Sequence, residues 1–181
     1  MVRLIGHGGF SLIYEVIWKK NGKKYAMKEL SNTITKINEI KNKVKLMVDF
    51  IKLTGCDGVI KVFGESSDYS NFSQYIILEL AESDLNKDLY KKRANNNYFT
   101  ENELIDILNQ LIDTFILLEK HSIAHRDIKP ENILRVEGKY KLCDFADSEK
   151  AVRGKRQHQV RGTHYFMSPL VYQAMLDKTT F

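Results

Sequence analysis

The chain has 181 residues, 43% of which are hydrophobic, and its formal net charge is +5. This length and apolar content suit one modest globular unit or two small lobes around a cleft, and they argue against a disordered chain. No apolar run is long enough to span a bilayer and no secretory signal is visible, so we expect a soluble protein of the cytoplasm or nucleus, with no membrane partner. The two cysteines lie far apart without a neighbouring histidine cluster, which indicates neither a disulfide framework nor a zinc site.

The positive charge comes from scattered clusters rather than from one tail. These clusters occupy residues 19–24, 87–93 and 152–161. Solvent-exposed faces explain them most simply, although a basic surface also attracts nucleotides and acidic protein substrates. No nucleic-acid recognition motif accompanies the charge, so a nucleic-acid partner is not expected, and the pattern does not indicate an oligomeric state.

The first 80 residues predict an antiparallel sheet of five strands that carries one helix. Apolar and polar residues alternate along the predicted strands, and Asn21-Gly22 tolerates the positive φ of a tight hairpin. Between the third and fourth strands, apolar residues recur at steps of three and four, as in an amphipathic helix. The pattern predicts two strands within 2–17, further strands at 24–30, 58–64 and 74–81, and the helix over 35–53.

A glycine-rich turn at residues 6–9 lies between two predicted strands. A dinucleotide-binding loop opens into a helix, and a Walker loop carries its own lysine beside Ser or Thr, so neither motif applies. Glycines in a hairpin let backbone N–H groups approach phosphates closely. Such a turn is more often only a turn, so the motif needs support from the rest of the chain.

Residues 81–181 are predicted to be helical at first and then to form a long loop with small strands. A short helix is expected within 83–93 and a long one over 100–121, which begins with a capping box of Thr100 and Glu103. Short apolar patches at 132–136 and 140–145 then predict small strands. With the preceding sheet, this gives an α+β fold. The apolar stripe expected on the long helix is Leu104, Leu108, Leu111, Phe115 and Leu118.

Four polar residues follow in the order that phosphoryl transfer requires. The reaction needs metal to neutralise phosphate charge, a lysine on the phosphates and an acid that orients the attacking hydroxyl. Lys28 and Asp127 suit the second and third roles, while Asn132 and Asp144 offer hard oxygen ligands for Mg²⁺. Alone, Asp127 or Asn132 would more often be a loop cap. In register with Lys28 and the glycine turn, they indicate a nucleotide site.

Five stretches of the chain resemble the eukaryotic protein kinase family, in chain order and with suitable intervals. The resemblance covers almost the whole chain and is most specific at residues 125–132. It implies a kinase N-lobe at 1–80 and a hinge with a partial C-lobe at 81–181, so we expect a chain truncated before the distal C-lobe. The stretches are "GHGGFSLIYEV", "YAMK", "HRDIKPEN", "DFA" and "GTHYFMSPL".

The resemblance implies an ATP site with Mg²⁺ as cofactor. Gly6 and Gly8 would lie over the nucleotide, with Ser11 in place of the third glycine of the loop. Lys28 would hold the α- and β-phosphates. The residues implied around the adenine are Ile5, Ile13, Ala26 and Leu134, with Leu78 as gatekeeper and the backbone of Glu79 to Ala81 as the hinge.

It also implies a catalytic set. Asp127 would be the base and Lys129 would meet the γ-phosphate. Lys129 and Thr163, which would position the substrate, are typical of serine/threonine kinases, so the expected partner is a protein substrate. The metal ligands would be Asn132 and Asp144, and His125 and Phe145 would stack in the core that couples the lobes.

The chain departs from the family in two places close to the nucleotide. Ala146 replaces a glycine, which is predicted to restrict movement of the loop while leaving Asp144 in place. The helix acid that pairs with the family's lysine is not assignable, because Glu39 and Asp49 lie off the apolar stripe and residues 43–48, where it is expected, read "KVKLMV".

The activation segment departs as well, since no Ser, Thr or Tyr lies between Glu149 and Arg161. Arg126, which in the family often binds a loop phosphate, has no such partner except Ser148. We therefore hypothesise activation by another route or constitutive ordering. Leu170 replaces an acidic residue of the family and cannot form its usual ion pair.

The resemblance favours a serine/threonine protein kinase that transfers the γ-phosphoryl group of ATP to a protein hydroxyl. The alternative is a pseudokinase, a non-catalytic module that binds nucleotide or acts as a scaffold. A small-molecule kinase is less favoured, because Gly162, Thr163 and Pro169 resemble a peptide-positioning loop.

Overall fold

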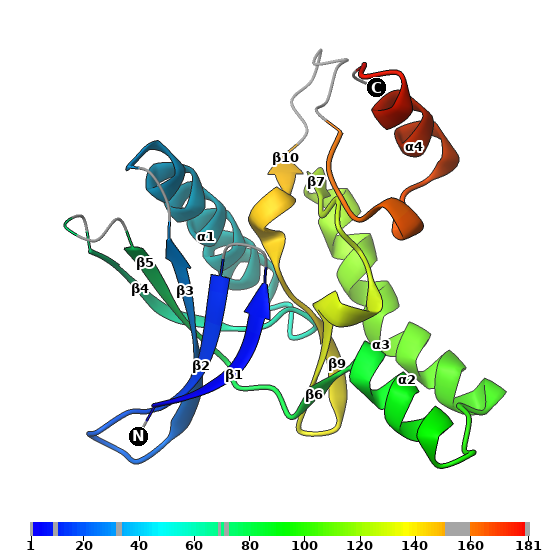
Figure 1. Cartoon of the computed structure of the whole chain (residues 1–181), viewed down its shortest axis with the longest axis horizontal. Helices are drawn as coiled ribbons and strands as arrows, with labels where there is room; N and C mark the ends of the chain where they lie inside the picture. Colours follow the sequence, from blue (N-terminus) through cyan, green and yellow to red (C-terminus); the bar gives the residue numbers. More distant parts are fainter. Residues whose placement is uncertain are drawn as a thin grey trace.

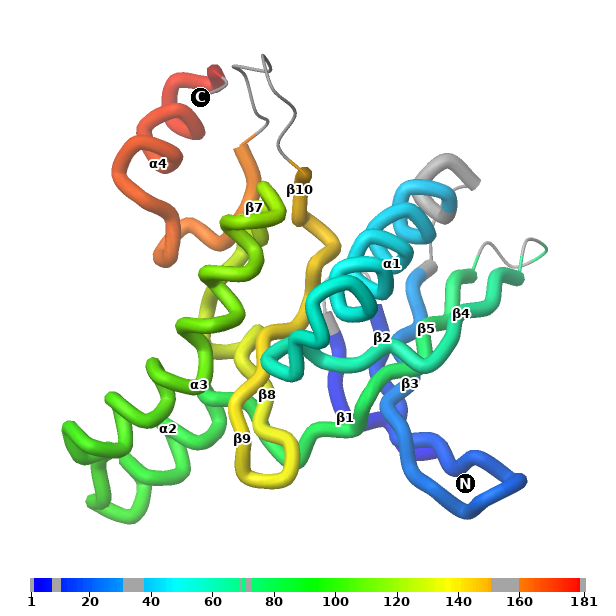
Figure 2. The backbone as a smooth tube through the Cα atoms, turned by 180° about the vertical axis from the view of Figure 1, so that it is seen from behind, coloured from blue at the N-terminus to red at the C-terminus, as the bar shows by residue number. Residues whose placement is uncertain are grey.

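The computed structural model describes residues 2–8, 11–31, 34–68, 70, 73–150 and 160–179. The protein has two lobes, with a sheet and one helix in the first and the other helices in the second (Figure 1). Seen from behind, a small hairpin lies between the long helix of the second lobe and the first lobe (Figure 2). The α+β architecture predicted from the sequence is confirmed.

One antiparallel sheet forms most of the first lobe. Its strands are β1 (Val2–Gly8), β2 (Ser11–Ile17), β3 (Lys24–Ser31), β4 (Val62–Asp68) and β5 (Ser73–Leu78). They lie in the order β1-β2-β3-β5-β4, which confirms the five-stranded prediction. Gly22 adopts a φ of 69° in the hairpin between β2 and β3, as the Asn-Gly pair predicts.

The fourth strand begins later than predicted. Residues 58–61 instead reach the second lobe, where the Ile60 N–H donates to the Leu142 carbonyl at 2.9 Å and the Leu142 N–H donates to the Gly58 carbonyl at 2.8 Å. An extended connector shows the same apolar pattern as a strand, so periodicity alone does not separate the two. This connector ties the sheet to the second lobe.

Helix α1 (Ile34–Thr54) packs against the sheet and confirms the helix predicted for 35–53. Its apolar stripe buries Val44, Met47 and Phe50. Val44 joins Leu30 of β3 and Ile76 of β5 in a small core between the helix and the sheet. This packing decides which side chains of α1 face the cleft between the lobes.

The second lobe opens with β6 (Ser83–Asp84), α2 (Leu85–Ala94) and α3 (Glu101–Lys120). The predicted capping box is present, because the Thr100 hydroxyl accepts the Glu103 N–H while the Glu103 carboxylate accepts the Thr100 N–H. No helix within the described ranges has the length and apolar character needed to cross a bilayer.

Short elements follow α3, as the apolar patches predict. Strand β8 pairs with β6 and β9, and β7 pairs with β10. Three of the elements are single 3₁₀ turns, labelled η. In chain order they are β7 (Ile123–Ala124), η1 (Pro130–Asn132), β8 (Ile133–Val136), β9 (Lys139–Leu142), η2 (Phe145–Asp147), β10 (Glu149–Lys150), η3 (His164–Phe166) and α4 (Pro169–Leu176).

The buried stripe of α3 differs from the predicted one. Leu104 and Leu108 are 45% and 64% exposed, so their predicted burial is wrong for the described residues. Leucine and isoleucine occupy two neighbouring stripes of this helix, and the sequence alone does not decide which of them meets the β8–β9 hairpin. The buried residues are Ile107, Leu111, Thr114 and Leu118.

One hydrophobic core spans both lobes. It joins Met47 and Phe50 of α1 to Leu111 and Leu118 of α3 and to Phe145 of η2. Because side chains of both lobes share this core, α1, α3 and η2 are packed as one unit around the cleft.

Candidate active site

Asp127 lies at the centre of a polar cluster between β7 and β8. Its Oδ1 accepts a hydrogen bond from the Thr163 hydroxyl at 2.7 Å. Its Oδ2 lies 2.8 Å from the Lys129 Nζ and accepts a hydrogen bond from the Asn132 side-chain amide at 2.9 Å. Lys129 also donates to the Thr163 hydroxyl at 2.8 Å. The fold therefore brings together four residues that the sequence analysis singled out for catalysis, metal binding and substrate positioning.

The surroundings of Asp127 keep its carboxyl group ionised. Burial by itself raises the pKa of Asp127, but the hydrogen bonds from Lys129 and Thr163 outweigh burial and hold the pKa below its usual value. A carboxylate with a lowered pKa is a weak base, but it orients a hydroxyl donor well.

Lys28 of β3 and Asp144 form an ion pair across the cleft. The Lys28 Nζ lies 2.8 Å from the Asp144 Oδ1. Burial raises the pKa of Asp144, while the charge and hydrogen bond of Lys28 and the N–H of Ala146 lower it, so that the carboxyl pKa falls below its usual value. Asp144 has a φ of 61°, a left-handed conformation that aspartate tolerates better than most residues.

His125 connects the backbones of the two aspartate segments. Its Nε2 lies 2.8 Å from the Cys143 carbonyl, and its Nδ1 accepts the Asp127 N–H at 3.3 Å. The ring also contacts Phe145 at 4.6 Å between centroids, so the predicted contact of this pair is present, with the rings edge to face rather than stacked. Burial lowers the pKa of His125, and the acceptor role of Nδ1 fits a neutral ring protonated at Nε2.

The donor set fits a divalent cation bound to a phosphorylated ligand. The Cys143 N–H donates to the Asn132 carbonyl at 2.9 Å, which places Asn132 beside Asp144. The Asn132 amide nitrogen is used on Asp127, so its amide oxygen is the atom that would face a metal. Within the described ranges no group of three His, Cys, Asp or Glu side chains is placed to hold a metal ion by itself, and Asn132 and Asp144 would supply two oxygen ligands.

The residues expected around the nucleotide lie on β1, β2, β3, β8 and the connection after β5. Gly6 lies opposite Ile13, which is opposite Lys28. The glycine loop is described as far as Gly8 and again from Ser11, so its tip lies outside the described residues. Ile5 and Leu134 are half-buried, Ala26 is buried opposite Leu78, and Glu79 to Ala81 join β5 to the second lobe.

Glu79 has more contacts than its expected hinge role requires. Its N–H donates to the Lys61 carbonyl at 3.0 Å, so an adenine would meet its carbonyl instead. Its carboxylate lies 3.1 Å from the Nζ of Lys141, a side chain only 5% exposed. The ATP contacts of this region remain predictions.

A lysine occupies the part of α1 where an acid was expected. Lys43 is half-buried and its Nζ donates to the Ser148 carbonyl, whereas Glu39 and Asp49 are exposed. Burial and then the charge of Arg126 lower the pKa of Lys43. Among the described residues, Asp144 is therefore the acid that pairs with Lys28.

Glu149 was missed by the sequence analysis. Its carboxylate lies 2.6 Å from the Arg126 guanidinium, and the two side chains are only 21% and 15% exposed. Ser148, the one phosphate acceptor considered for Arg126, is buried and its hydroxyl donates to the Phe145 carbonyl at 2.7 Å, so in this conformation the side chain that pairs with Arg126 is Glu149. The sequence feature that could have indicated Glu149 is its position as an acid directly before the basic stretch 150–161.

Two backbone positions distinguish a required glycine from a dispensable one. Gly162 has a φ of 117°, and a Cβ there would lie 2.5 Å from the Arg126 carbonyl. Only glycine therefore lets Thr163 approach Asp127 along this path. Ala146 lies in η2 without a positive φ and with its side chain exposed, so alanine fits the conformation observed.

The segment after Thr163 leads into α4. The Ser168 hydroxyl accepts the Val171 N–H at 3.4 Å and caps the helix, with Pro169 in its first turn. Leu170, in the first turn of the helix, is 71% exposed.

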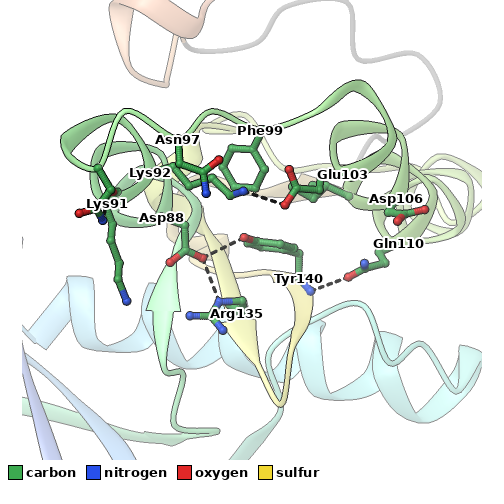
Figure 3. Close-up of a pocket in the computed structure, with 12 residues that line it drawn as sticks. Asp88, Lys91, Lys92, Asn97, Phe99, Glu103, Asp106, Gln110, Arg135 and Tyr140 are labelled. Atoms are coloured by element: carbon green, nitrogen blue, oxygen red, sulfur yellow. Dashed lines mark hydrogen bonds and ion pairs between the residues drawn. The ribbon is translucent and has the colours of Figure 1, made fainter.

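A cavity of about 440 Å³ lies apart from this cleft, between α2, α3 and the β8–β9 hairpin (Figure 3). Several of its polar groups pair with one another. Asp88 accepts hydrogen bonds from Arg135 at 2.9 Å and from the Tyr140 hydroxyl at 2.8 Å, and Gln110 accepts the Tyr140 N–H at 2.8 Å. This network attaches the hairpin to the helices and presents no second reactive centre.

Comparison with known proteins yields relatives along almost the whole chain. A probable serine/threonine-protein kinase of Dictyostelium discoideum is 28% identical and matches 99% of this chain. The Aurora kinase of Candida glabrata is 31% identical and matches 92%. Calcium-dependent protein kinase 5 of Plasmodium berghei is 27% identical and matches 96%. The chain spans 31%, 46% and 30% of these relatives, respectively.

The protein kinase domain family matches residues 1–179. This match includes the Lys28–Asp144 pair, the Asp127 cluster and the His125–Phe145 contact, which lie in the cleft between the lobes. The chain therefore belongs to the protein kinase domain family.

Proposed function

We propose that this domain is a serine/threonine protein kinase that transfers the γ-phosphoryl group of ATP to a hydroxyl of a protein substrate. The observation that carries the proposal is the Asp127 carboxylate, which Lys129, Asn132 and Thr163 hold together. The name of the Dictyostelium discoideum relative, a probable serine/threonine-protein kinase, supports the same substrate class.

Each residue of the cleft has a role in this proposal. Gly6, Gly8 and Ser11 cover the phosphates, and Lys28 holds the α- and β-phosphates. Asn132 and Asp144 would hold Mg²⁺, which would supply positive charge against the phosphates. Asp127 orients the substrate hydroxyl and receives its proton as the new O–P bond forms and the bond between the γ-phosphorus and the β,γ-bridging oxygen breaks, which releases ADP.

Two further residues would act on the reacting groups. Lys129 lies beside Asp127 and offers a positive charge to the γ-phosphate. Thr163 joins the catalytic loop to the segment that would carry the substrate peptide, because its hydroxyl donates to Asp127.

A non-catalytic nucleotide-binding module is the second candidate, and the Lys28–Asp144 pair favours it. In place of a helix acid, Lys28 pairs with Asp144, a proposed metal ligand. Metal binding would draw Asp144 away from Lys28 and leave the lysine to the phosphates alone. A pseudokinase tolerates this competition more easily than an enzyme does.

The test measures labelled-phosphate transfer from Mg-ATP to a Ser/Thr peptide library by the intact natural protein. Asp127→Asn is expected to lower kcat at least about a hundredfold and to leave ATP affinity within about twofold. Asp144→Asn is expected to weaken Mg²⁺-dependent ATP binding as well. Asp106→Asn, on the exposed face of α3, is the matched control and retains activity.

Equal transfer by Asp127→Asn and the natural protein contradicts the proposed mechanism. Transfer by neither protein, with ATP still bound, selects the non-catalytic module.

A further inference from the structure

The segment that follows Asp144 is held from two sides. From the catalytic loop, Arg126 donates through Nε to the Asp147 carbonyl at 2.5 Å and pairs with the Glu149 carboxylate at 2.6 Å. From α1, Lys43 donates to the Ser148 carbonyl. Three consecutive residues, 147 to 149, are thus bound by two cations that come from different lobes.

The Arg126–Glu149 pair is not a surface contact. Both side chains are largely buried, so loss of either charge leaves the other with little access to water. The guanidinium also forms a fork, with one nitrogen on a carbonyl and another on the carboxylate, which fixes its orientation.

The same residues are adjacent to the proposed reacting groups. Arg126 precedes Asp127 and has a φ of 71°, a strained conformation that its contacts must maintain. Glu149 pairs with Ala124 where β10 joins β7, directly before the catalytic loop. Asp144 begins the turn that leads to Asp147.

We infer that Glu149 and Lys43 are positioning residues of the phosphoryl-transfer site, which hold Arg126 and the segment 147–149 in place without a phosphate on the activation segment. This inference rests on the proposed function. In this arrangement, Lys43 makes a basic contact from the part of α1 where an acid was expected. The carboxylate of Glu149 takes the place of an added phosphate as the partner of Arg126.

The sequence of the segment agrees with this inference. Residues 150–162 contain no Ser, Thr or Tyr. Ser148 is fully buried with its hydroxyl bound to the Phe145 carbonyl, so it is closed to a modifying enzyme in this conformation.

The experiment compares Glu149→Gln and Lys43→Met in the intact protein. We expect each to lower kcat about tenfold or more, with the KM for ATP within about twofold, because neither side chain belongs to the proposed nucleotide-binding set. Glu149→Asp retains the charge and is expected to recover kcat to within about threefold of the natural protein. The matched controls are Glu119→Gln and Lys45→Met, both at exposed positions, and they retain full kcat.

A double variant tests the pairing itself. Arg126→Met with Glu149→Gln is expected to be no slower than Arg126→Met alone, since the second change removes a partner that is already lost. Treatment of the natural protein with a phosphatase is expected to leave its activity unchanged. Additive losses, a Glu149→Gln variant as active as its control, or inactivation by phosphatase each overturn the inference.

Amide hydrogen exchange separates this inference from the proposed function. Glu149→Gln and Lys43→Met are expected to accelerate exchange at residues 144–150, whereas the two controls do not. If the natural protein transfers no phosphate, the proposed function fails and exchange alone decides whether the two residues hold the segment. Unchanged exchange at 144–150 then overturns the inference.

Discussion

At the scale of single residues, His125 shows how a buried ring organises a site without touching a reacting atom. It accepts the Asp127 N–H, bonds the Cys143 carbonyl and contacts Phe145. These contacts require a neutral ring, because a proton on Nδ1 would remove the acceptor for Asp127. The histidine thus makes the alignment of the two aspartate segments depend on pH.

The first prediction concerns this dependence. Burial lowers the pKa of His125 in the folded protein below its ordinary 6.5, so below pH 6.5 the unfolded chain binds the proton more readily. The stabilisation is complete above pH 6.5 and is lost as the pH falls through the folded pKa, by at most about 1.4 kcal/mol per pH unit. Urea unfolding of the intact protein from pH 7.5 to 5 measures the loss.

His125→Gln is the comparison, since it removes the titrating ring while other groups still titrate. The natural protein is expected to lose more stability than this variant between pH 6.5 and 5. Parallel pH profiles for the two proteins would refute the assignment of a lowered pKa to His125.

At the scale of elements, the α1–β4 connector depends on a close approach to α3. A Cβ on Gly58 would lie 1.9 Å from the Thr114 hydroxyl oxygen and 3.2 Å from its Cβ. Thr114 is buried in the middle of α3, so it has little room to move. Because Gly58 has no side chain, the connector can cross α3 closely and still pair with β9.

The second prediction is that Gly58→Ala destabilises the intact protein by about 1–3 kcal/mol through overpacking. Adding Thr114→Ala removes the nearest clash, so Gly58→Ala is expected to cost less in that background. Gly64→Ala is the control, because no atom lies within 4 Å of its Cβ, and it is expected to stay within about 0.5 kcal/mol of the natural protein. Urea unfolding measures the natural protein, the three single variants and the double variant, and equal losses at Gly58 and Gly64 would contradict the overpacking.

At the scale of the whole molecule, a buried lysine joins the two lobes. Lys141 on β9 is 5% exposed, and its Nζ lies 3.1 Å from Glu79 after β5 and 3.3 Å from Asp57 in the connector. Two carboxylates from the first lobe and its hinge therefore meet one cation from the second. The hinge region is tied to the hairpin by charge as well as by the shared core.

The third prediction compares Lys141→Met with Lys61→Met. Loss of Lys141 leaves the mostly buried Glu79 carboxylate without its cation, and we expect a loss of about 1–3 kcal/mol of unfolding free energy. Lys61 also pairs with Asp57, but both side chains are about half exposed, so the control is expected to lose less than about 1 kcal/mol. Thermal and urea unfolding of the intact protein measure both variants, and similar losses would show that burial of Lys141 does not matter.

Much of the fold was predictable because local sequence patterns specify its strands, turns and helix ends. Alternation and the Asn21-Gly22 turn predicted the sheet, apolar spacing predicted α1, and the capping box located the start of α3. The buried stripe of α3 was predicted incorrectly in part, since Leu104 and Leu108 are exposed. Which of two apolar stripes is buried depends on the partner, and the partner is distant in sequence.

By itself, the sequence determined the membership in the protein kinase domain family. It also singled out Lys28, Asp127, Asn132 and Asp144 as candidate site residues, because these side chains have recognisable chemistry at recognisable spacing. Only the tertiary structure decided that Lys28 pairs with Asp144, that Lys43 donates to the Ser148 carbonyl, and that Glu149 pairs with Arg126. The physical reason is that these contacts depend on distance in space, and the fold brings the partners together across 116, 105 and 23 residues of chain, respectively.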